Sequence, residues 1–470
     1  MVVAGIGAVK ETIPSREIQF HPLSFQDEAG RLFKWRGELY RGLSGPSASF
    51  LAQFVEGDAG RELMATGLLV ETEVTGFAVE GFDLVLRHRL LPFPSYPFEW
   101  CAGMFRAATL VVIELAIALA RSGLMLKDAH PWNVLFDGCH PLWVDLTSIQ
   151  PANGSRLWPA EAEFYDNCVH PLLLMAQGRD KLARAIIAES EVVQRADLEL
   201  LGGSRSLLID MTTALLSHLP EEKRKAIRKT LRPLRAVLRR KEKAAPDIPL
   251  MQRLEQIKAE VAGIRLSSCE PRALSHDFQP NEKWNTKQRS VHRILSEKKP
   301  RTVLDIASGT GWSSQLAAQF SEHVVAFDLD AEAVAHLFDT ARSRDLPILP
   351  LVMDFTRPTP ARGLGGHVHI AASERFSCEM VLLLGFLHDL VFRYRRLGLT
   401  EICDALASFS RRWLVVEFIP GDDAEVGPLW SNWFAAYTLD NFKSALGRHF
   451  SKIEVLPSYP GARVLLLCER

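Results

Sequence analysis

The chain has 470 residues, of which 47% are hydrophobic and 24% charged, with a formal net charge of −1. This length exceeds what one hydrophobic core usually organises, so the sequence predicts two or three domains. The nearly balanced charge argues against a protein whose whole surface attracts nucleic acid or an anionic membrane.

Seven scattered cysteines include no C-x-x-C pair, which argues against a disulfide framework and against a zinc site, and suits a reducing cytosol. The N-terminus lacks the basic and apolar regions of a signal peptide. The most apolar run, 108–120, is too short to span a bilayer and contains Glu114. We therefore expect a cytoplasmic protein with no membrane span.

The first half of the chain mixes predicted strands and helices. Alternation of polar and apolar residues predicts a hairpin over 31–43 and two further strands over 77–93, and an apolar periodicity predicts a helix over about 99–122. Residues 160–240 are mostly helical in pattern. A basic stretch at 221–243 has eleven Lys or Arg against three Glu; it could touch nucleic acid, but a solvated connecting helix is the preferred interpretation.

Prolines at 246 and 249 interrupt the chain before a further helical pattern, so we predict a linker at 244–275 between domains at 1–243 and 276–470. Beyond residue 300, strands and helices alternate. This rhythm predicts an α/β fold with a doubly wound, mostly parallel sheet. The predicted strands are 301–308, 323–330, 348–355, 379–390 and 412–420.

Acidic and glycine residues follow the first three of these strands. The stretch "VLDIASGTG" runs from a buried strand into a turn, where Gly309 and Gly311 let a ligand approach the backbone. Asp305 could accept a hydrogen bond from a ligand ammonium, Asp328 is placed for a ribose diol, and Asp354 lies beside an adenine amino group. The spacing disfavours NAD. The alternative is that these acids only cap the following helices.

This arrangement resembles the class I S-adenosylmethionine-dependent methyltransferases over roughly 275–470. The resemblance implies that the Asp305–Gly311 loop, with Ala307 where the family often has glycine, holds the methionine part of the cofactor. It also implies that Asp328 holds the ribose and Asp354 the adenine edge.

The whole chain resembles a narrower bacterial group of methyltransferase-like proteins that have a kinase-like N-terminal region and include host-specific nodulation proteins. The segments on which this resemblance rests are "YPFEW", "LKDAHPWNVLFDGCHPLWVDLTSI", "PRTVLDIASGTG", "ILPLVMDFTRPTPA", "GFLHDL" and "VVEFIP".

Methyl transfer needs an aligned acceptor and, for an oxygen or amine acceptor, a base. His388 in "GFLHDLVF" is the candidate base or positioning residue, with Asp389 as the alternative; a histidine that only bonds a loop is an equal possibility. Glu417 is a second candidate for the rim of the site, although a structural carboxylate is favoured. Trp430 and Trp433 could wall an acceptor pocket, but large aromatic residues are more often core.

The stretch "KDAHPWN" followed by "WVDL" has the spacing of a kinase catalytic loop and its metal-binding aspartate. Asp128 would be the base, and Asn133 and Asp145 would hold the metal. No glycine-rich loop precedes them, and Lys34 is the only plausible phosphate-binding lysine. We therefore predict an α+β kinase-like module that has lost catalysis. A plain turn and an active kinase are the alternatives.

The resulting interpretation is a methyltransferase that uses S-adenosylmethionine, has no metal, and has a small-molecule, lipid or sugar acceptor, such as a nodulation-related signal molecule. Nucleic acid is an unlikely partner. Two alternatives stay open: a phosphotransferase using Asp128, Asn133 and Asp145, and a non-catalytic protein that binds S-adenosylmethionine.

Overall fold

A computed structural model describes residues 11–21, 24, 27, 29–201, 248–266, 278–394, 397–427 and 435–470. The contacts divide the chain into two compact units. The first unit comprises Met1–Ala108, Val134–Thr147 and Ser268–Arg470, and the second comprises Thr109–Asn133 and Ser148–Ser267. The basic stretch 221–243 and the residues Trp430 and Trp433 lie outside the described part of the chain. The domain boundaries from the sequence stay a prediction.

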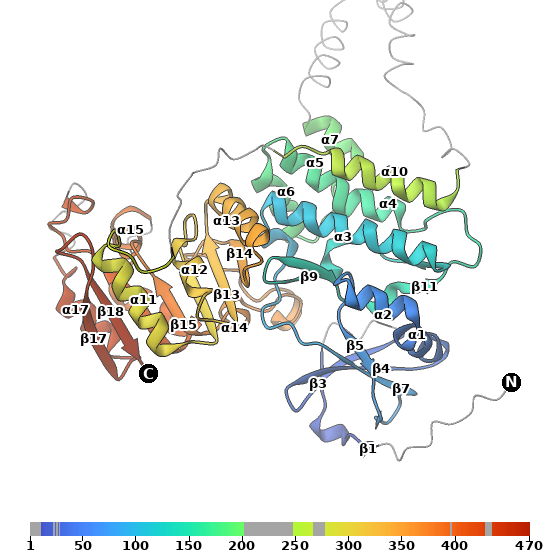
Figure 1. The fold of residues 1–470 in the computed structure, drawn as a ribbon, viewed down its shortest axis with the longest axis horizontal. Coiled ribbons are helices and arrows are strands. Elements are labelled where there is room, and N and C mark those ends of the chain that lie inside the picture. The colour runs from blue at the N-terminus through green and yellow to red at the C-terminus, as the bar shows by residue number, and fades with distance from the viewer. Residues whose placement is uncertain are drawn as a thin grey trace, which may run out of the picture. The chain divides into compact units, whose positions relative to one another are not determined.

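The N-terminal part of the first unit is built on a five-stranded antiparallel sheet of order β2-β3-β4-β7-β5 (Figure 1). The predicted hairpin at 31–43 is confirmed by β3 and β4, and the two strands predicted at 77–93 are β6 and β7. Buried aromatic residues hold this sheet, and the rings of Phe33 and Tyr40 stack at 5.5 Å. Its elements are β1 Glu11–Thr12, β2 Gln19–Phe20, β3 Gly30–Trp35, β4 Glu38–Leu43, α1 Pro46–Glu56, α2 Asp58–Ala65, β5 Thr72–Val74, β6 Phe77–Ala78 and β7 Leu84–His88, and the hairpin β9 Val134–Asp137 and β10 His140–Trp143 belongs to the same unit.

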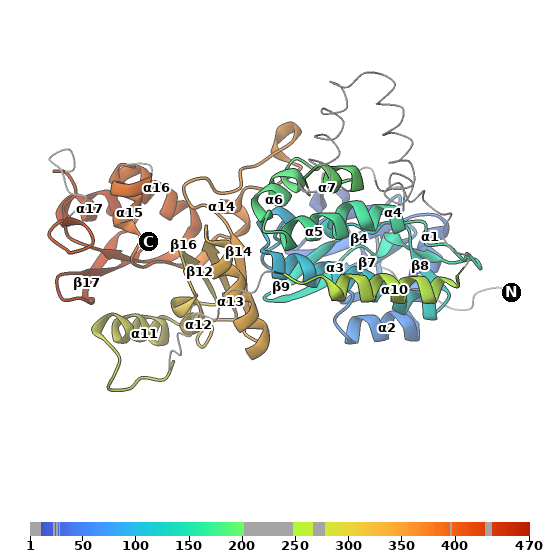
Figure 2. The same ribbon diagram turned by 90° about the horizontal axis from the view of Figure 1, so that it is seen from above.

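The second unit is mainly helical. The last helix before the C-terminal part, α10, packs back onto it: Lys258 pairs with Glu114 at 3.0 Å, and the Tyr165 hydroxyl donates to Glu260 at 2.6 Å. Figures 1 and 2 both draw α10 alongside the other helices of this unit. The predicted linker therefore contains a helix that belongs to the second unit. The elements are the larger part of α3 Ala102–Arg121, β8 Leu124–Leu126, β11 Ile149–Pro151, α4 Glu161–Phe164, α5 His170–Ala176, α6 Asp180–Ala188, α7 Arg195–Leu201 and α10 Leu250–Gly263.

Helix α3 corresponds to the helix predicted at 99–122. Among the described residues it is the one helix long and apolar enough to cross a membrane, and 67% of its most apolar window is buried within the protein. Val112, Ile113 and Leu115 are fully buried. Burial of this kind is what the core helix of a folded domain requires.

The C-terminal part of the first unit is a seven-stranded sheet of order β14-β13-β12-β15-β16-β18-β17. The strands β12 to β16 are parallel to one another, and β18 is antiparallel to both β16 and β17. This order confirms the doubly wound, Rossmann-like sheet expected for this half. The elements are α11 Thr286–Lys298, β12 Thr302–Ile306, α12 Trp312–Ala317, β13 His323–Asp328, α13 Ala331–Arg344, β14 Ile348–Val352, α14 Ala372–Arg375, β15 Cys378–Leu383, α15 Leu387–Asp389, α16 Leu399–Phe409, β16 Ser410–Phe418, α17 Leu439–Leu446, β17 Lys452–Pro457 and β18 Val464–Glu469.

The central strands are apolar because both faces of the sheet are covered. Residues Val324 to Phe327 of β13 are all buried, as expected for a parallel strand between two layers of helices. Helix α13 is preceded by Asp330, whose side chain accepts from the backbone N–H groups of Glu332 and Ala333. Asp330 is thus the cap of this helix, and it lies two residues after Asp328.

The structure differs from the sequence prediction after β15. We predicted a strand over 379–390, but β15 ends at Leu383 and a short helix contains His388 and Asp389. Gly385 has φ +75°, a backbone conformation that a strand cannot continue through. The chain therefore turns at this glycine, so His388 and Asp389 follow a turn.

The turn after β12 supplies a test of backbone strain. Gly311 has φ +80°, and a Cβ there would overlap the side chain of Leu337, whereas Ala307 already occupies the left-handed region at φ +57°. We expect Gly311→Ala to destabilise the protein by roughly 1 kcal/mol or more, and Ala307→Gly to be neutral or stabilising by less than about 1 kcal/mol. Denaturant unfolding of both variants measures these changes; a Gly311→Ala protein as stable as wild type would contradict this account of the turn.

Candidate functional site

A cavity of about 230 Å³ opens at the carboxyl ends of the parallel strands of the C-terminal sheet. Its lining comes from the segments that follow β12, β13, β14 and β15. In a doubly wound sheet this edge is where ligands bind. The lining residues are Ala307, Asp328, Leu329, Met353, Asp354, Phe355, Thr356, Leu384, Gly385, Phe386 and Asp389. Three sequence-predicted residues of the cofactor site, Ala307, Asp328 and Asp354, are among them.

Asp328 ends β13 and links the glycine turn to the next segment. Its Oδ2 accepts from the backbone N–H of Gly309 at 2.7 Å, and its Oδ1 accepts from that of Asp330 at 2.8 Å. Burial raises the pKa of this carboxyl, while the backbone hydrogen bonds oppose the rise. The carboxylate is thereby held at the cavity, where it can accept hydrogen bonds from a ligand hydroxyl.

Asp354 lies at the end of β14 and is held by the residues that follow it. Its Oδ1 accepts from the backbone N–H and the hydroxyl of Thr356, at 2.8 and 2.6 Å, and its Oδ2 accepts from Arg357 at 3.1 Å. Burial by itself would raise the pKa of Asp354, but the hydrogen bonds from Thr356 and Arg357 outweigh it and lower the pKa. Leu329, Met353 and Phe355 add apolar surface to this end of the cavity.

Asp305 lies beneath the turn and is not among the lining residues of the cavity. Its side chain is almost fully buried, and its Oδ2 accepts from the hydroxyls of Ser313 and Ser314, each at 2.6 Å. These bonds fix the start of α12 against the end of β12. The predicted contact of Asp305 with a ligand ammonium stays a prediction.

The side chains of His388 and Asp389 have different surroundings. Asp389 lines the cavity and pairs with Arg393 at 3.2 Å. His388 is buried, and its Nε2 lies 3.5 Å from Glu425 and 3.7 Å from Asp389. Burial lowers the pKa of His388, which favours the neutral, basic imidazole. Asp389 is thus the candidate that reaches the cavity directly.

Lys287 is a residue of this region to which the sequence assigned no role. It extends from the first turn of α11 to the fully buried carboxylate of Glu417, with Nζ 2.6 Å from Oε2, and Ser458 donates to the other oxygen. A Cβ on Gly385, which lines the cavity, would lie 3.7 Å from both charged groups. Glu417 is therefore a paired carboxylate behind the cavity wall, and no motif in the sequence marks this pairing.

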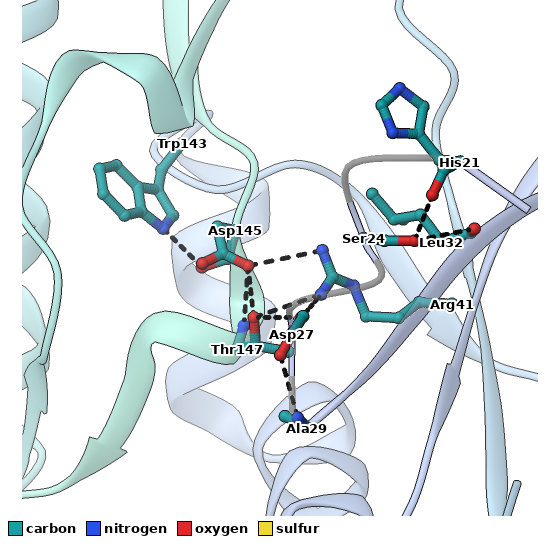
Figure 3. A network of polar contacts seen from close by, with 9 residues as sticks. All are labelled: His21, Ser24, Asp27, Ala29, Leu32, Arg41, Trp143, Asp145 and Thr147. Atoms are coloured by element: carbon teal, nitrogen blue, oxygen red, sulfur yellow. Dashed lines mark hydrogen bonds and ion pairs between the residues drawn. The ribbon is translucent and has the colours of Figure 1, made fainter. Parts of the chain in front are cut away.

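A second polar cluster lies in the N-terminal part of the same unit (Figure 3). The buried guanidinium of Arg41 pairs with Asp27 at 2.5 Å and with Asp145 at 3.4 Å. Thr147 donates its backbone N–H and hydroxyl to Oδ1 of Asp145, at 3.2 and 2.6 Å. A metal ion at this oxygen would have to compete with both groups.

The cation beside Asp145 is therefore Arg41, whereas the sequence singled out Lys34, whose side chain is exposed on β3. Both Asp128 and Asn133 belong to the second unit: Asp128 lies in the loop after β8, and Asn133 ends a short 3-10 helix, Pro131–Asn133, directly before β9. Their proposed catalytic and metal-binding roles stay predictions.

The comparisons with known proteins agree with the resemblance seen in the sequence. No family model matches the chain. The chain is 27% identical over 442 residues, 90% of each chain, to nodulation protein NoeA of Rhizobium meliloti strain 1021. Solved structures with similarity include the N-methyltransferase NodS of Bradyrhizobium japonicum WM9 (13% identity, 39% of this chain and 96% of that one, TM-score 0.28). A further match is the bifunctional kinase-methyltransferase WbdD (14% identity, 39% of this chain and 40% of that one, TM-score 0.29).

Because these TM-scores are low, the fold assignment depends on the strand order and register described above. The relative at 90% coverage confirms the resemblance of this chain to the bacterial methyltransferase-like group that includes nodulation proteins.

The buried Asp305 gives the site a pH-dependent stability. Burial raises the pKa of this carboxyl from 3.8 to about 6, despite the two serine hydrogen bonds. The folded state thus binds this proton more tightly than the unfolded state does. The resulting stabilisation of the folded state is fully present below about pH 4 and is lost as the pH rises through about 6. Relative to Asp305→Asn, wild type should lose roughly 2–3 kcal/mol of unfolding free energy across this range. Denaturant unfolding at stepped pH tests this; a difference that stays constant with pH would contradict it.

The Arg41 cluster makes a second prediction. Arg41→Met leaves Asp27 and Asp145 without their shared cation, and should destabilise the protein by roughly 2 kcal/mol or more. Arg61→Met is the control, because Arg61 and its partner Asp58 are exposed and such pairs contribute roughly 0–1 kcal/mol. Equal unfolding midpoints for the two variants would mean that the Arg41 cluster does not stabilise the fold.

Proposed function

We propose that the chain is an S-adenosylmethionine-dependent methyltransferase whose cofactor lies along the carboxyl edge of β12 to β15. The observation that carries this proposal is the meeting of Ala307, Asp328 and Asp354 around one cavity. Gly309 and Gly311 of the turn are not among the lining residues, and Gly309 is tied to the site through its N–H bond to Asp328. The similarity to a nodulation protein supports a small-molecule, lipid or sugar signal molecule, or its precursor, as the acceptor.

The chemistry of the cavity suits this cofactor. Asp328, which accepts from the Gly309 N–H, is well placed to accept hydrogen bonds from a ribose diol as well. The apolar side chains of Leu329, Met353 and Phe355 suit the faces of an adenine, and Asp354 lies beside them. The bound cofactor would supply an activated methyl group, and the protein would supply alignment of the acceptor.

The acceptor would approach from the side of the segment that follows β15. Asp389 reaches the cavity and can accept a proton or orient the acceptor, and Nε2 of His388 lies 3.7 Å from its Oδ1. We retain both residues as candidates, with Asp389 as the group in contact and His388 as the group that positions it. Because Asp145 is engaged by Arg41 and Thr147, we do not favour a phosphotransferase.

Substitution of Asp328 tests the proposal against helix capping as the role of these acids. Asp328→Asn keeps the size of the side chain but loses the charge and one acceptor, so S-adenosylmethionine should bind roughly 10- to 100-fold more weakly. Asp330→Ala removes the α13 cap two residues away and should cost about 1 kcal/mol of stability with little change in affinity. Equilibrium binding of radiolabelled cofactor measures both. Unchanged affinity in a folded Asp328→Asn protein would contradict the proposed site.

A further inference from the structure

Residues 94–99, in the N-terminal half, form hydrogen bonds and an ion pair with the connection between β14 and β15. Both segments belong to the first unit. Glu99 and Arg375 form a bidentate ion pair, with Nη1 3.0 Å from Oε2 and Nη2 2.5 Å from Oε1. Their side chains are only 2% and 1% exposed. A bidentate pair is geometrically specific, and a buried charge that loses its partner is strongly unfavourable.

The same segment makes three further polar contacts with this connection. The Thr359 hydroxyl donates to Glu99 at 2.6 Å, the backbone N–H of Ile370 donates to the Tyr96 hydroxyl at 2.7 Å, and Arg375 donates to the carbonyl of Pro94 at 2.8 Å. The guanidinium of Arg375 also lies 4.1 Å from the centre of the Tyr96 ring. The connection is thus bonded at its start, its middle and its end by residues 94–99.

This connection begins with one wall of the candidate cofactor cavity. Met353, Asp354, Phe355 and Thr356 all line the cavity, and Thr359 follows three residues later. Asp354 takes its orientation from Thr356 and Arg357, which lie in the same connection. A shift of the Thr359 end would therefore move the groups that orient Asp354.

We propose that Glu99 and Arg375 are positioning residues for cofactor binding, acting through Thr359 on the wall that carries Asp354. This inference rests on the proposed function, and it makes the affinity of the C-terminal site depend on residues 94–99 of the N-terminal half. An ion pair that is only structural would change the stability of the protein without changing the affinity of the folded molecule for the cofactor.

The test compares Glu99→Gln and Thr359→Val with the full-length wild type. Glu99→Gln keeps an oxygen acceptor but removes the charge that Arg375 faces, and Thr359→Val removes one hydrogen bond at nearly constant volume. Glu322→Gln is the control, because it alters an exposed ion pair with Arg301 at the amino ends of β12 and β13, the edge of the sheet opposite the cavity. Affinities for S-adenosylmethionine and for adenosine are measured at a temperature below the thermal unfolding midpoint of every variant.

We expect about tenfold weaker binding of both ligands for Glu99→Gln and about threefold for Thr359→Val, with no change for the control. Adenosine should follow the cofactor because the affected wall is assigned to the adenine. Wild-type affinity in folded Thr359→Val and Glu99→Gln would overturn this inference and leave the proposed function standing. If Glu99→Gln does not fold, wild-type affinity in Thr359→Val suffices to overturn it. A wild-type protein that binds neither ligand would overturn the proposed function itself, and this inference with it.

Discussion

The parallel pairing of β12 with β13 and of β13 with β14 is the constraint on which the candidate site depends. Because parallel strands bring their carboxyl ends to one edge, this pairing places Ala307, Asp328 and Asp354 around a single cavity. The hydrogen bond from the Gly309 N–H to Asp328 then joins the first two of these segments directly. Beneath them, Asp305 and two serine hydroxyls fix the turn from the buried side.

Two buried arginines, one in each half of the chain, join distant segments of the first unit. Arg41 holds together segments that are far apart in the sequence, since it pairs with Asp27 and with Asp145. Arg375, at the end of α14, does the same through its pair with Glu99. In both cases a delocalised cation with several donors satisfies carboxylates that would be unfavourable alone in a protein interior. The first unit is therefore held by ion pairs as well as by its apolar core.

Most of the elements that have a strong hydrophobic periodicity can be predicted correctly from the sequence. The hairpin at 31–43 and the alternating strands beyond residue 300 follow from local pattern, and Asp328 and Asp354 lie where strand ends place them. Three features could not be found this way. The turn at Gly385 interrupts an apolar run that reads as a strand, and the pairs Lys287–Glu417 and Glu99–Arg375 join residues more than a hundred positions apart. Tertiary packing determines these features, and no local pattern encodes it.

The central claim is that the ligand site of this chain lies at the carboxyl ends of β12 to β15, rather than at the Asp145 cluster. Calorimetric titration of the full-length protein with S-adenosylmethionine, and separately with ATP and magnesium, tests it most directly. The account predicts saturable heat with about one site per chain for S-adenosylmethionine and no heat of binding for ATP with magnesium, because Arg41 and Thr147 engage Asp145. Binding of ATP with magnesium in the absence of any binding of S-adenosylmethionine would contradict it.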